Sequence, residues 1–239
     1  MINKVSKVVI LAGGFGSRLS EYTNLIPKPM VKIGNKPILI HIMKLYLNFG
    51  YRDFYILMGY KSSVIKKYFK NFKSKWKINL IETGLDTMTG GRVKRMKKYL
   101  KNETFMLTYG DGLSNININK LVKFHKKQKK IITISAVRPP ARFGSLKLKG
   151  SKVLNFREKS QLDESWINGG FFVIEPSFFK MIKGDSTILE KEPLERAVKE
   201  KKICAYKHNA FWQCMDHKLD KDLLDELVKK RKAPWLIQD

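Results

Sequence analysis

The stretch VVILAGGFGSRLSEYTNLIPKPMVKIGNKPI, from Val8 to Ile38, decides the fold prediction. It opens with a β-branched run typical of a buried strand and passes directly into Gly13, Gly14 and Gly16. In doubly wound α/β proteins the first strand–helix turn is the usual phosphate site, because glycines there let backbone N–H groups approach an anion. We therefore expect a ligand site at this turn.

Strand-like and helix-like runs alternate through the first half of the chain. Strands are predicted at 7–13, 53–59, 77–84 and 104–112, and helices at 36–50, 62–72, 90–100 and 118–128. Such repetition is typical of an α/β fold with a doubly wound, mostly parallel (Rossmann-like) sheet and helices on both faces. After residue 131 the pattern changes to short strands at 132–137, 145–150, 152–159 and 166–175, with helices near 187–200 and 217–231. We predict one domain over 1–239, whose second half adds a small mixed-sheet substrate region.

Composition is that of a globular protein, with 43% hydrophobic residues in 239. No apolar run approaches the roughly 20 residues that cross a bilayer, and the N-terminus has no signal-peptide pattern. Cys204 and Cys214 show no metal or redox spacing. We expect reduced thiols, a cytoplasmic protein and no membrane partner.

The formal charge of +27 leaves two interpretations open. Lysines supply most of the excess and are spread over nearly every segment, with HKKQKKI at 125–131 the only dense run. This distribution favours a compositional bias, and we expect no nucleic-acid partner. The alternative is a protein that binds nucleic acid, which predicts steeply salt-dependent binding to generic DNA.

Two better-known phosphate loops are excluded by the residues around the glycines. A dinucleotide fingerprint needs a third glycine where Leu19 stands, and no segment supplies the P-loop pattern. A tight turn alone would explain the glycines but not Arg18 or the PKP sequence at 27–29. Proline on each side stiffens the backbone of Lys28. Arg18 and Lys28 together fit a clamp for a polyphosphate.

Together the motifs LAGGFGSRL…PKPM, TYGDGL, FREK, INGGFFV and FWQCMD resemble the signature of the sugar-1-phosphate nucleotidylyltransferases over essentially the whole chain. TGGR at 89–92 and FWQCMD at 211–216 point more narrowly to the cytidylyl branch, which makes CDP-glucose from CTP and glucose 1-phosphate. The resemblance implies the nucleotide-diphospho-sugar transferase fold, with a nucleotide-binding half over about 1–131 and a sugar-phosphate-binding half over about 132–239. It also implies Mg²⁺, a homo-oligomer and a place in the synthesis of surface polysaccharide such as the O-antigen of lipopolysaccharide.

The same resemblance implies a role for each matching residue. Arg18 and Lys28 would be catalytic, and Asp111 and Asp216 would hold the metal. The nucleotide-binding residues would be Leu11, Ala12, Gly13, Gly14, Phe15, Gly16, Ser17, Thr87, Gly90 and Arg92. The sugar-phosphate-binding residues would be Glu158, Lys159, Asn168 and Gly169.

Structural interpretations of several of these residues stay open. Asp111 also fits an ordinary turn, Asp216 a helix N-cap, Thr89 the N-cap of the helix at 90–100, and the NGG sequence at 168–170 a β-bulge. The mechanism that the resemblance implies is in-line attack of the sugar phosphate on the α-phosphorus of CTP, with pyrophosphate leaving. It needs no enzyme nucleophile and no catalytic histidine.

Three departures from the family pattern accompany the resemblance. The chain is shorter between about 72 and 80, and Ser160 and Cys214 stand where proline is common. Two other functions also stay open. One is a related transferase that uses UTP or dTTP, or another hexose 1-phosphate, and the other is a non-catalytic nucleotide-sugar sensor.

Overall fold

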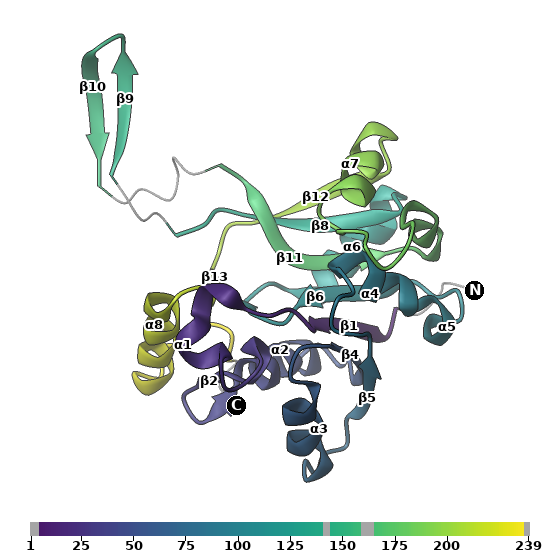
Figure 1. The fold of residues 1–239 in the computed structure, drawn as a ribbon. Coiled ribbons are helices and arrows are strands. Elements are labelled where there is room, and N and C mark those ends of the chain that lie inside the picture. The colour runs from purple at the N-terminus through teal and green to yellow at the C-terminus, as the bar shows by residue number, and fades with distance from the viewer. Residues whose placement is uncertain (1–4, 141–143, 159–164, 237–239) are drawn as a thin grey trace.

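The computed structural model describes residues 5–140, 144–158 and 165–236. The fold is built around a seven-stranded sheet (Figure 1). Its order is β12-β8-β11-β6-β1-β4-β5. Its strands are β1 (Lys7–Ala12), β4 (Asp53–Met58), β5 (Lys77–Glu82), β6 (Phe105–Tyr109), β8 (Ile132–Val137), β11 (Ile167–Ile174) and β12 (Ile203–His208). β11 runs antiparallel to both of its neighbours, whereas all other pairs in this sheet are parallel.

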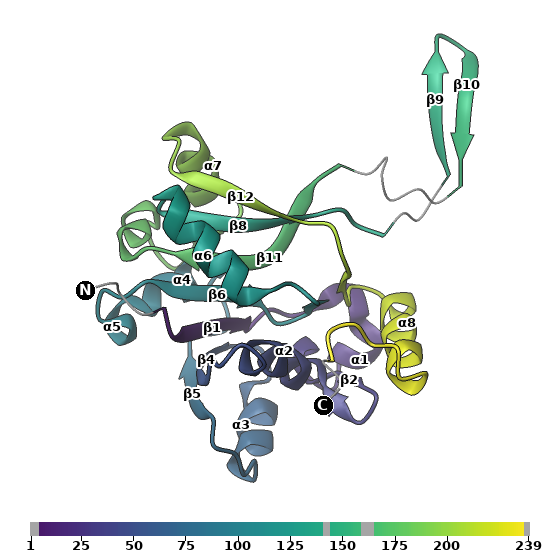
Figure 2. The same cartoon turned by 180° about the vertical axis from the view of Figure 1, so that it is seen from behind.

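Helices cover both faces of the sheet, as Figures 1 and 2 show from opposite sides. Every residue of β1 is buried, since Val8 and Ile10 face one hydrophobic cluster while Val9 and Leu11 face the other. The first cluster includes residues of α2 (Ile38–Leu47), α3 (Ser62–Lys70), α6 (Ile118–Gln128) and α8 (Lys218–Lys229). The second includes residues of α4 (Thr89–Arg95), α5 (Lys97–Leu100), α7 (Glu192–Lys199) and the 3₁₀ helix η4 (Pro176–Met181).

The segment after β1 is built from short pieces. It contains the 3₁₀ helices η1 (Ser17–Leu19) and η2 (Lys28–Met30), the single turn α1 (Ser20–Thr23), and the paired β2 (Lys32–Ile33) and β3 (Lys36–Pro37). A second small pair joins β7 (Gly112–Ser114) to β13 (Trp212–Cys214) in antiparallel register, with Cys214 opposite Gly112. This second pair brings residues from the middle of the chain and from near its C-terminus to one place beside the sheet.

A two-stranded hairpin, β9 (Ser145–Lys149) and β10 (Lys152–Arg157), projects away from the sheet in both views. Leu146 faces Phe156 and Leu148 faces Val153 across the two strands, and these four side chains are all about half exposed or more. Apolar and polar residues alternate along these strands, a pattern that predicts one buried apolar face. Within the described chain, however, no other segment covers that face.

The predicted fold class is confirmed. One strand of the main sheet, the edge strand β12, was not predicted, and the other differences are local. The strands at 132–137 and 166–175 extend the main sheet instead of forming a separate one, because β11 is apolar over its length and pairs on both edges. The helix predicted at 90–100 is divided at Met96. The helix predicted from 187 begins at Glu192, because Asp185 and Thr187 accept hydrogen bonds from the start of α4 instead of entering a helix. Among the described residues, no helix is long and apolar enough to span a bilayer.

Candidate active site

The carboxyl ends of β1, β5 and β6 meet at one edge of the sheet, and the loops that follow them form a cavity of about 470 Å³. Its lining contains most of the predicted nucleotide site and all of the predicted catalytic pair. The predicted residues found there are Leu11, Ala12, Gly13, Gly14, Phe15, Gly16, Ser17, Arg18, Lys28, Thr87, Arg92 and Asp111. Gly90 is outside this lining, and it packs against Thr187, whose carbonyl accepts the Gly90 N–H at 2.9 Å.

A second cavity of about 360 Å³ adjoins the first. Because β11 is antiparallel, its first residues lie at the same edge as the last residues of β6. Asn168 and Gly169 line this second cavity together with Asp216, and Arg18, Tyr109 and Asp111 line both cavities. The two spaces therefore meet beside two of the predicted charged groups.

The remaining sugar-phosphate predictions have a different outcome. Glu158 follows the last residue of β10 and is exposed, and neither cavity includes it. Lys159 lies outside the described residues. The structure thus brings Asn168 and Gly169 to the charged groups but does not bring Glu158 there.

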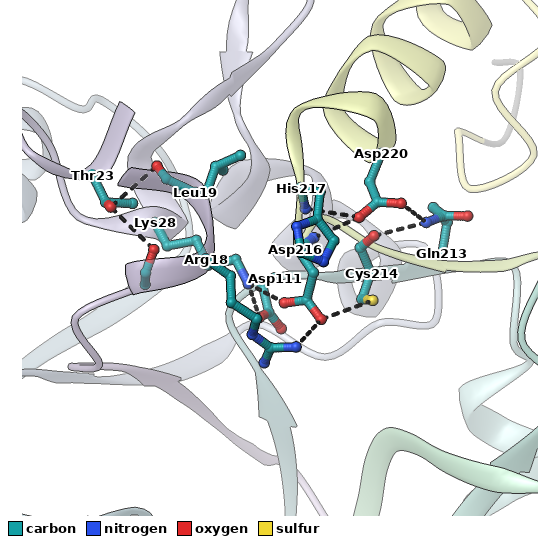
Figure 3. Close-up of polar contacts among 11 residues, drawn as sticks. Arg18, Leu19, Thr23, Lys28, Asp111, Gln213, Cys214, Asp216, His217 and Asp220 are labelled. Carbon is teal, nitrogen blue, oxygen red and sulfur yellow. Dashed lines mark hydrogen bonds and ion pairs between the residues drawn. The ribbon is translucent and has the colours of Figure 1, made fainter. Parts of the chain in front are cut away.

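Four charged side chains meet where the cavities join (Figure 3). The Nζ of Lys28 lies 2.7 Å from Oδ2 of Asp111 and 2.6 Å from Oδ1 of Asp216, and Nη1 of Arg18 lies 2.7 Å from Oδ2 of Asp216. Lys28 is nearly buried, with 10% of its side chain exposed, whereas 67% of the Arg18 side chain is exposed. One ammonium group therefore bridges both predicted metal ligands.

Burial and charge oppose each other in this cluster. Burial alone would lower the pKa of Lys28, but the adjoining carboxylates of Asp111 and Asp216 outweigh it and raise that pKa. Burial alone would raise the pKa of Asp216, but its hydrogen bond and ion pair with Lys28, aided by Arg18, lower it. Burial and the neighbouring carboxylates raise the pKa of the Cys214 thiol to about 12, so this cysteine stays protonated.

The β7–β13 pair is the reason that the two carboxylates meet. Asp111 directly precedes β7, Asp216 closely follows β13, and the Met215 N–H donates to the Asp111 carbonyl at 2.9 Å. The helix-cap interpretation of Asp216 is wrong, because the N-cap of α8 is His217. Instead the carboxylate of Asp220, in the first turn of α8, accepts from the backbone N–H of Asp216 at 3.0 Å.

Gly16 is required by the close passage of Lys28. Its φ of +66° is in the left-handed region, and a Cβ there would lie 2.9 Å from the Thr23 methyl group and 3.0 Å from the Lys28 Cβ. The Thr23 hydroxyl closes the same turn by donating to the Gly16 carbonyl at 3.0 Å. The glycine thus sets the position of the lysine stem.

Arg92 lines the first cavity, but its guanidinium is directed into the protein. Only 4% of the residue is exposed. A Cβ on Gly13 would lie 2.3 Å from Nη1 of Arg92, so glycine is needed there as well. The guanidinium donates to oxygen atoms of five residues at the ends of three strands, Gly13 after β1, Met58 at the end of β4, and Thr83, Gly84 and Leu85 after β5. Arg92 holds the walls of the cavity together.

The structure adds Tyr109 and Glu190, which the sequence did not single out, and corrects the interpretation of Thr89. Tyr109 separates the two cavities, and its hydroxyl donates to Glu190 at 2.6 Å. Thr89 does not cap α4, whose N-cap is Met88, because its hydroxyl donates to Glu190 at 2.7 Å. Tyr109 lies inside the TYGDGL motif and was within reach of sequence reasoning, but Glu190 lies in an irregular loop with no pattern to mark it.

The donor set at the junction fits a hard divalent cation held jointly with phosphate. The described residues contain no group of three or more histidine, cysteine, aspartate or glutamate side chains able to hold a metal on their own. Asp111 and Asp216 supply two carboxylates, and Mg²⁺ sites commonly use one or two carboxylates plus substrate phosphates. The Lys28 ammonium shows that a cation is favoured between them.

Fold and site together define an enzyme class that binds a nucleotide and a second substrate at one sheet edge. Residues 7–217 match the nucleotidyl transferase family, and the chain belongs to that family. It is 44% identical to the glucose-1-phosphate cytidylyltransferase of Salmonella typhimurium over 96% of this chain and 98% of that one. It is 41% identical to a probable glucose-1-phosphate cytidylyltransferase of Bacillus subtilis, over 88% of this chain and 91% of that one.

Solved structures agree on the fold. HddC from Yersinia pseudotuberculosis, complexed with GMP-PN, superimposes with a TM-score of 0.74 at 25% identity, over 94% of this chain and 100% of that one. The alignment with the Salmonella protein spans 252 positions, more than the 239 residues of this chain, so that relative carries residues that this chain lacks.

Proposed function

We propose that this protein transfers the cytidylyl group of CTP to α-D-glucose 1-phosphate, giving CDP-glucose and pyrophosphate. The observation that carries the proposal is the junction of two cavities at Arg18 and Asp111, where Lys28 bridges the paired carboxylates. Its substrates follow from the relatives named glucose-1-phosphate cytidylyltransferase, which are 41% to 44% identical to nearly the whole chain.

In the proposed mechanism this chain supplies position and charge, not a nucleophile. The nucleotide lies in the first cavity, with its triphosphate along the turn after β1, and the sugar phosphate lies in the second cavity. Arg18 and Lys28 neutralise charge on the phosphate groups as the sugar phosphate attacks the α-phosphorus in line and pyrophosphate leaves. Mg²⁺ held by Asp111 and Asp216 would supply further charge neutralisation.

The finer assignments belong to the same proposal. Thr87 and Phe15 contact the nucleoside, and Asn168 and Gly169 contact the sugar. Glu158 and Lys159 grip the sugar and its phosphate. Glu158 directly follows β10 and is exposed, so this role requires the hairpin to approach a sugar cavity.

We also propose that the enzyme is a cytoplasmic homo-oligomer. Two free cysteines among the described residues suit a reducing compartment. The exposed apolar face of the β9–β10 hairpin supports assembly, because an isolated two-stranded hairpin is marginally stable in water and this face suits burial against a second copy.

The test is pyrophosphate release with Mg²⁺ and glucose 1-phosphate, compared across CTP, UTP, dTTP, ATP and GTP. Strong preference for CTP, with CDP-glucose identified by mass, is the expected result. Preference for UTP or dTTP would keep the enzyme class and replace the substrate. No release with any nucleotide, and none with other hexose 1-phosphates, would favour a non-catalytic sensor.

A further inference from the structure

Glu190 is a carboxylate in the wall of the second cavity that the mechanism above does not use. It lies in the loop before α7. Its Oε1 accepts a hydrogen bond from the Tyr109 hydroxyl at 2.6 Å, and its Oε2 accepts one from the Thr89 hydroxyl at 2.7 Å. The Asn168 amide in turn donates to the Tyr109 hydroxyl at 3.1 Å. These groups form one hydrogen-bonded wall.

The charges in this cavity divide it into two ends. Asp111 and Asp216 are paired with Lys28, and Asp216 also with Arg18. The partners described for Glu190 are hydroxyl groups, which leave its negative charge in place. A sugar phosphate is therefore repelled at the Glu190 end. At the other end the two acids are neutralised by cations, and the Arg18 guanidinium, with 67% of its side chain exposed, can pair with the phosphate. This arrangement directs the uncharged sugar ring toward Glu190.

Two fixed donors leave Glu190 with free acceptor capacity. A carboxylate has about four lone-pair sites, and Tyr109 and Thr89 occupy one on each oxygen. Burial and the Glu190 charge raise the pKa of Tyr109, so its hydroxyl keeps the proton that orients the carboxylate. The remaining sites suit neutral hydroxyl donors in the cavity.

We propose that Glu190, oriented by Tyr109 and Thr89, accepts hydrogen bonds from the hexose hydroxyl groups and determines which sugar is used. This inference rests on the proposed function and identifies the side chain that recognises the sugar. Glu190 is exposed at the cavity wall, and a hexose bound in the cavity would cover it. A bound analogue that lacks the matching hydroxyl then leaves the covered carboxylate unpaired, and the site discriminates against it.

The test measures kcat/KM for glucose 1-phosphate and its four monodeoxy derivatives, with CTP saturating, in the wild type and Glu190→Gln. For the wild type, kcat/KM with at least one deoxy derivative should be about tenfold or more below kcat/KM with glucose 1-phosphate. With glucose 1-phosphate, kcat/KM of Glu190→Gln should be lower than that of the wild type by a similar factor. With that same deoxy derivative, kcat/KM of the wild type and of Glu190→Gln should be nearly equal. Discrimination at the other hydroxyls and the KM for CTP should be unchanged.

Glu195→Gln is the matched control, since Glu195 is an exposed carboxylate on α7 outside both cavities. If Glu190→Gln lowered kcat/KM equally for all five sugar phosphates, the inference would be overturned. A change in the KM for CTP as large as the change in kcat/KM for glucose 1-phosphate would also overturn it. Both outcomes would leave the proposed function standing. If no hexose 1-phosphate releases pyrophosphate with the wild type, the proposed function fails and this inference fails with it. Thermal unfolding midpoints of the three proteins check that each is folded.

Discussion

At the scale of single residues, the site depends on a lysine that is buried between two acids. Lys28 has 10% of its side chain exposed, and such a cation is stable only while its partners stay ionised. Its raised pKa and the lowered pKa of Asp216 are two results of one contact. Changing either acid therefore disturbs both the charge and the position of Lys28.

Asp111→Asn should lower kcat by at least about a hundredfold, because it removes a carboxylate proposed to hold the metal while keeping the volume of the side chain. Pyrophosphate release measures the loss, and circular dichroism checks the fold. Asp222→Asn, which changes an exposed aspartate on α8, is the control and should keep full activity. Activity of Asp111→Asn near that of the control would mean that Asp111 does not hold the metal.

Arg92→Lys should lower the free energy of unfolding by about 2 kcal/mol or more, because lysine leaves several buried oxygen acceptors unpaired at about 1–3 kcal/mol each. The KM for CTP should rise as the Gly13 turn loosens. Urea unfolding and initial-rate kinetics measure both effects. Arg95→Lys, on the same helix, changes an exposed pair with Asp185 and should alter stability little. Equal losses in both variants would contradict the role given to Arg92.

At the scale of elements, the short pieces decide the site more than the long ones. The β7–β13 pair joins Asp111 to Asp216 through three residues on each strand. The β9–β10 hairpin has one apolar face and one face that carries Lys147, Lys149 and Lys152. A strand pair of this pattern normally buries its apolar face.

Replacing Leu146 and Phe156 by serine should reduce the oligomer mass measured by light scattering, because it removes a cross-strand apolar pair from the exposed face. Lys147→Ser, on the opposite face of the same hairpin, should leave the mass unchanged. A wild type that is monomeric at micromolar concentration would contradict the assembly, as would an unchanged mass in the double serine variant.

How far the sequence predicts these elements depends on the range of the interactions. Hydrophobic periodicity is local, so it predicted six of the seven strands of the main sheet and the ligand turn at Gly13. It missed the edge strand β12, none of whose residues is fully buried. The three-residue pairing of β7 with β13 rests on contacts between distant segments and has no local pattern. The sequence alone does not distinguish a buried arginine such as Arg92 from a solvated one. Glu190 can be recognised as a site residue only from the tertiary structure, in which its loop packs against β6.

At the scale of the whole molecule, stability should depend on pH through the buried His41 and His125 and the half-buried His208. Burial lowers the pKa of His41, His125 and His208. Each therefore contributes stability that is present above its unfolded pKa, about 6.5, and that is lost as pH falls through its lower folded pKa. His41 shows why, because it accepts from the Trp235 indole at 3.2 Å only while its Nδ1 is unprotonated.

The free energy of unfolding should consequently fall as the pH is lowered from 7 to 5, with each histidine contributing at most about 1.4 kcal/mol per pH unit. Urea titrations across this range measure the slope. His125→Gln should reduce the slope, whereas a change at exposed Lys126 should not. The same slope in wild type and His125→Gln would contradict the assignment of this titration to His125.

The reversed direction of β11 has a consequence for how such enzymes diversify. The cavity after β1 is lined entirely by residues up to Asp111, whereas its neighbour draws Asn168, Glu190 and Trp212 from the later chain. Recombination between these stretches would exchange one substrate preference and leave the other intact. On the proposed assignment of the two cavities, a single scaffold can thus generate a repertoire of activated sugars, with the choice of base and the choice of hexose inherited as separate traits.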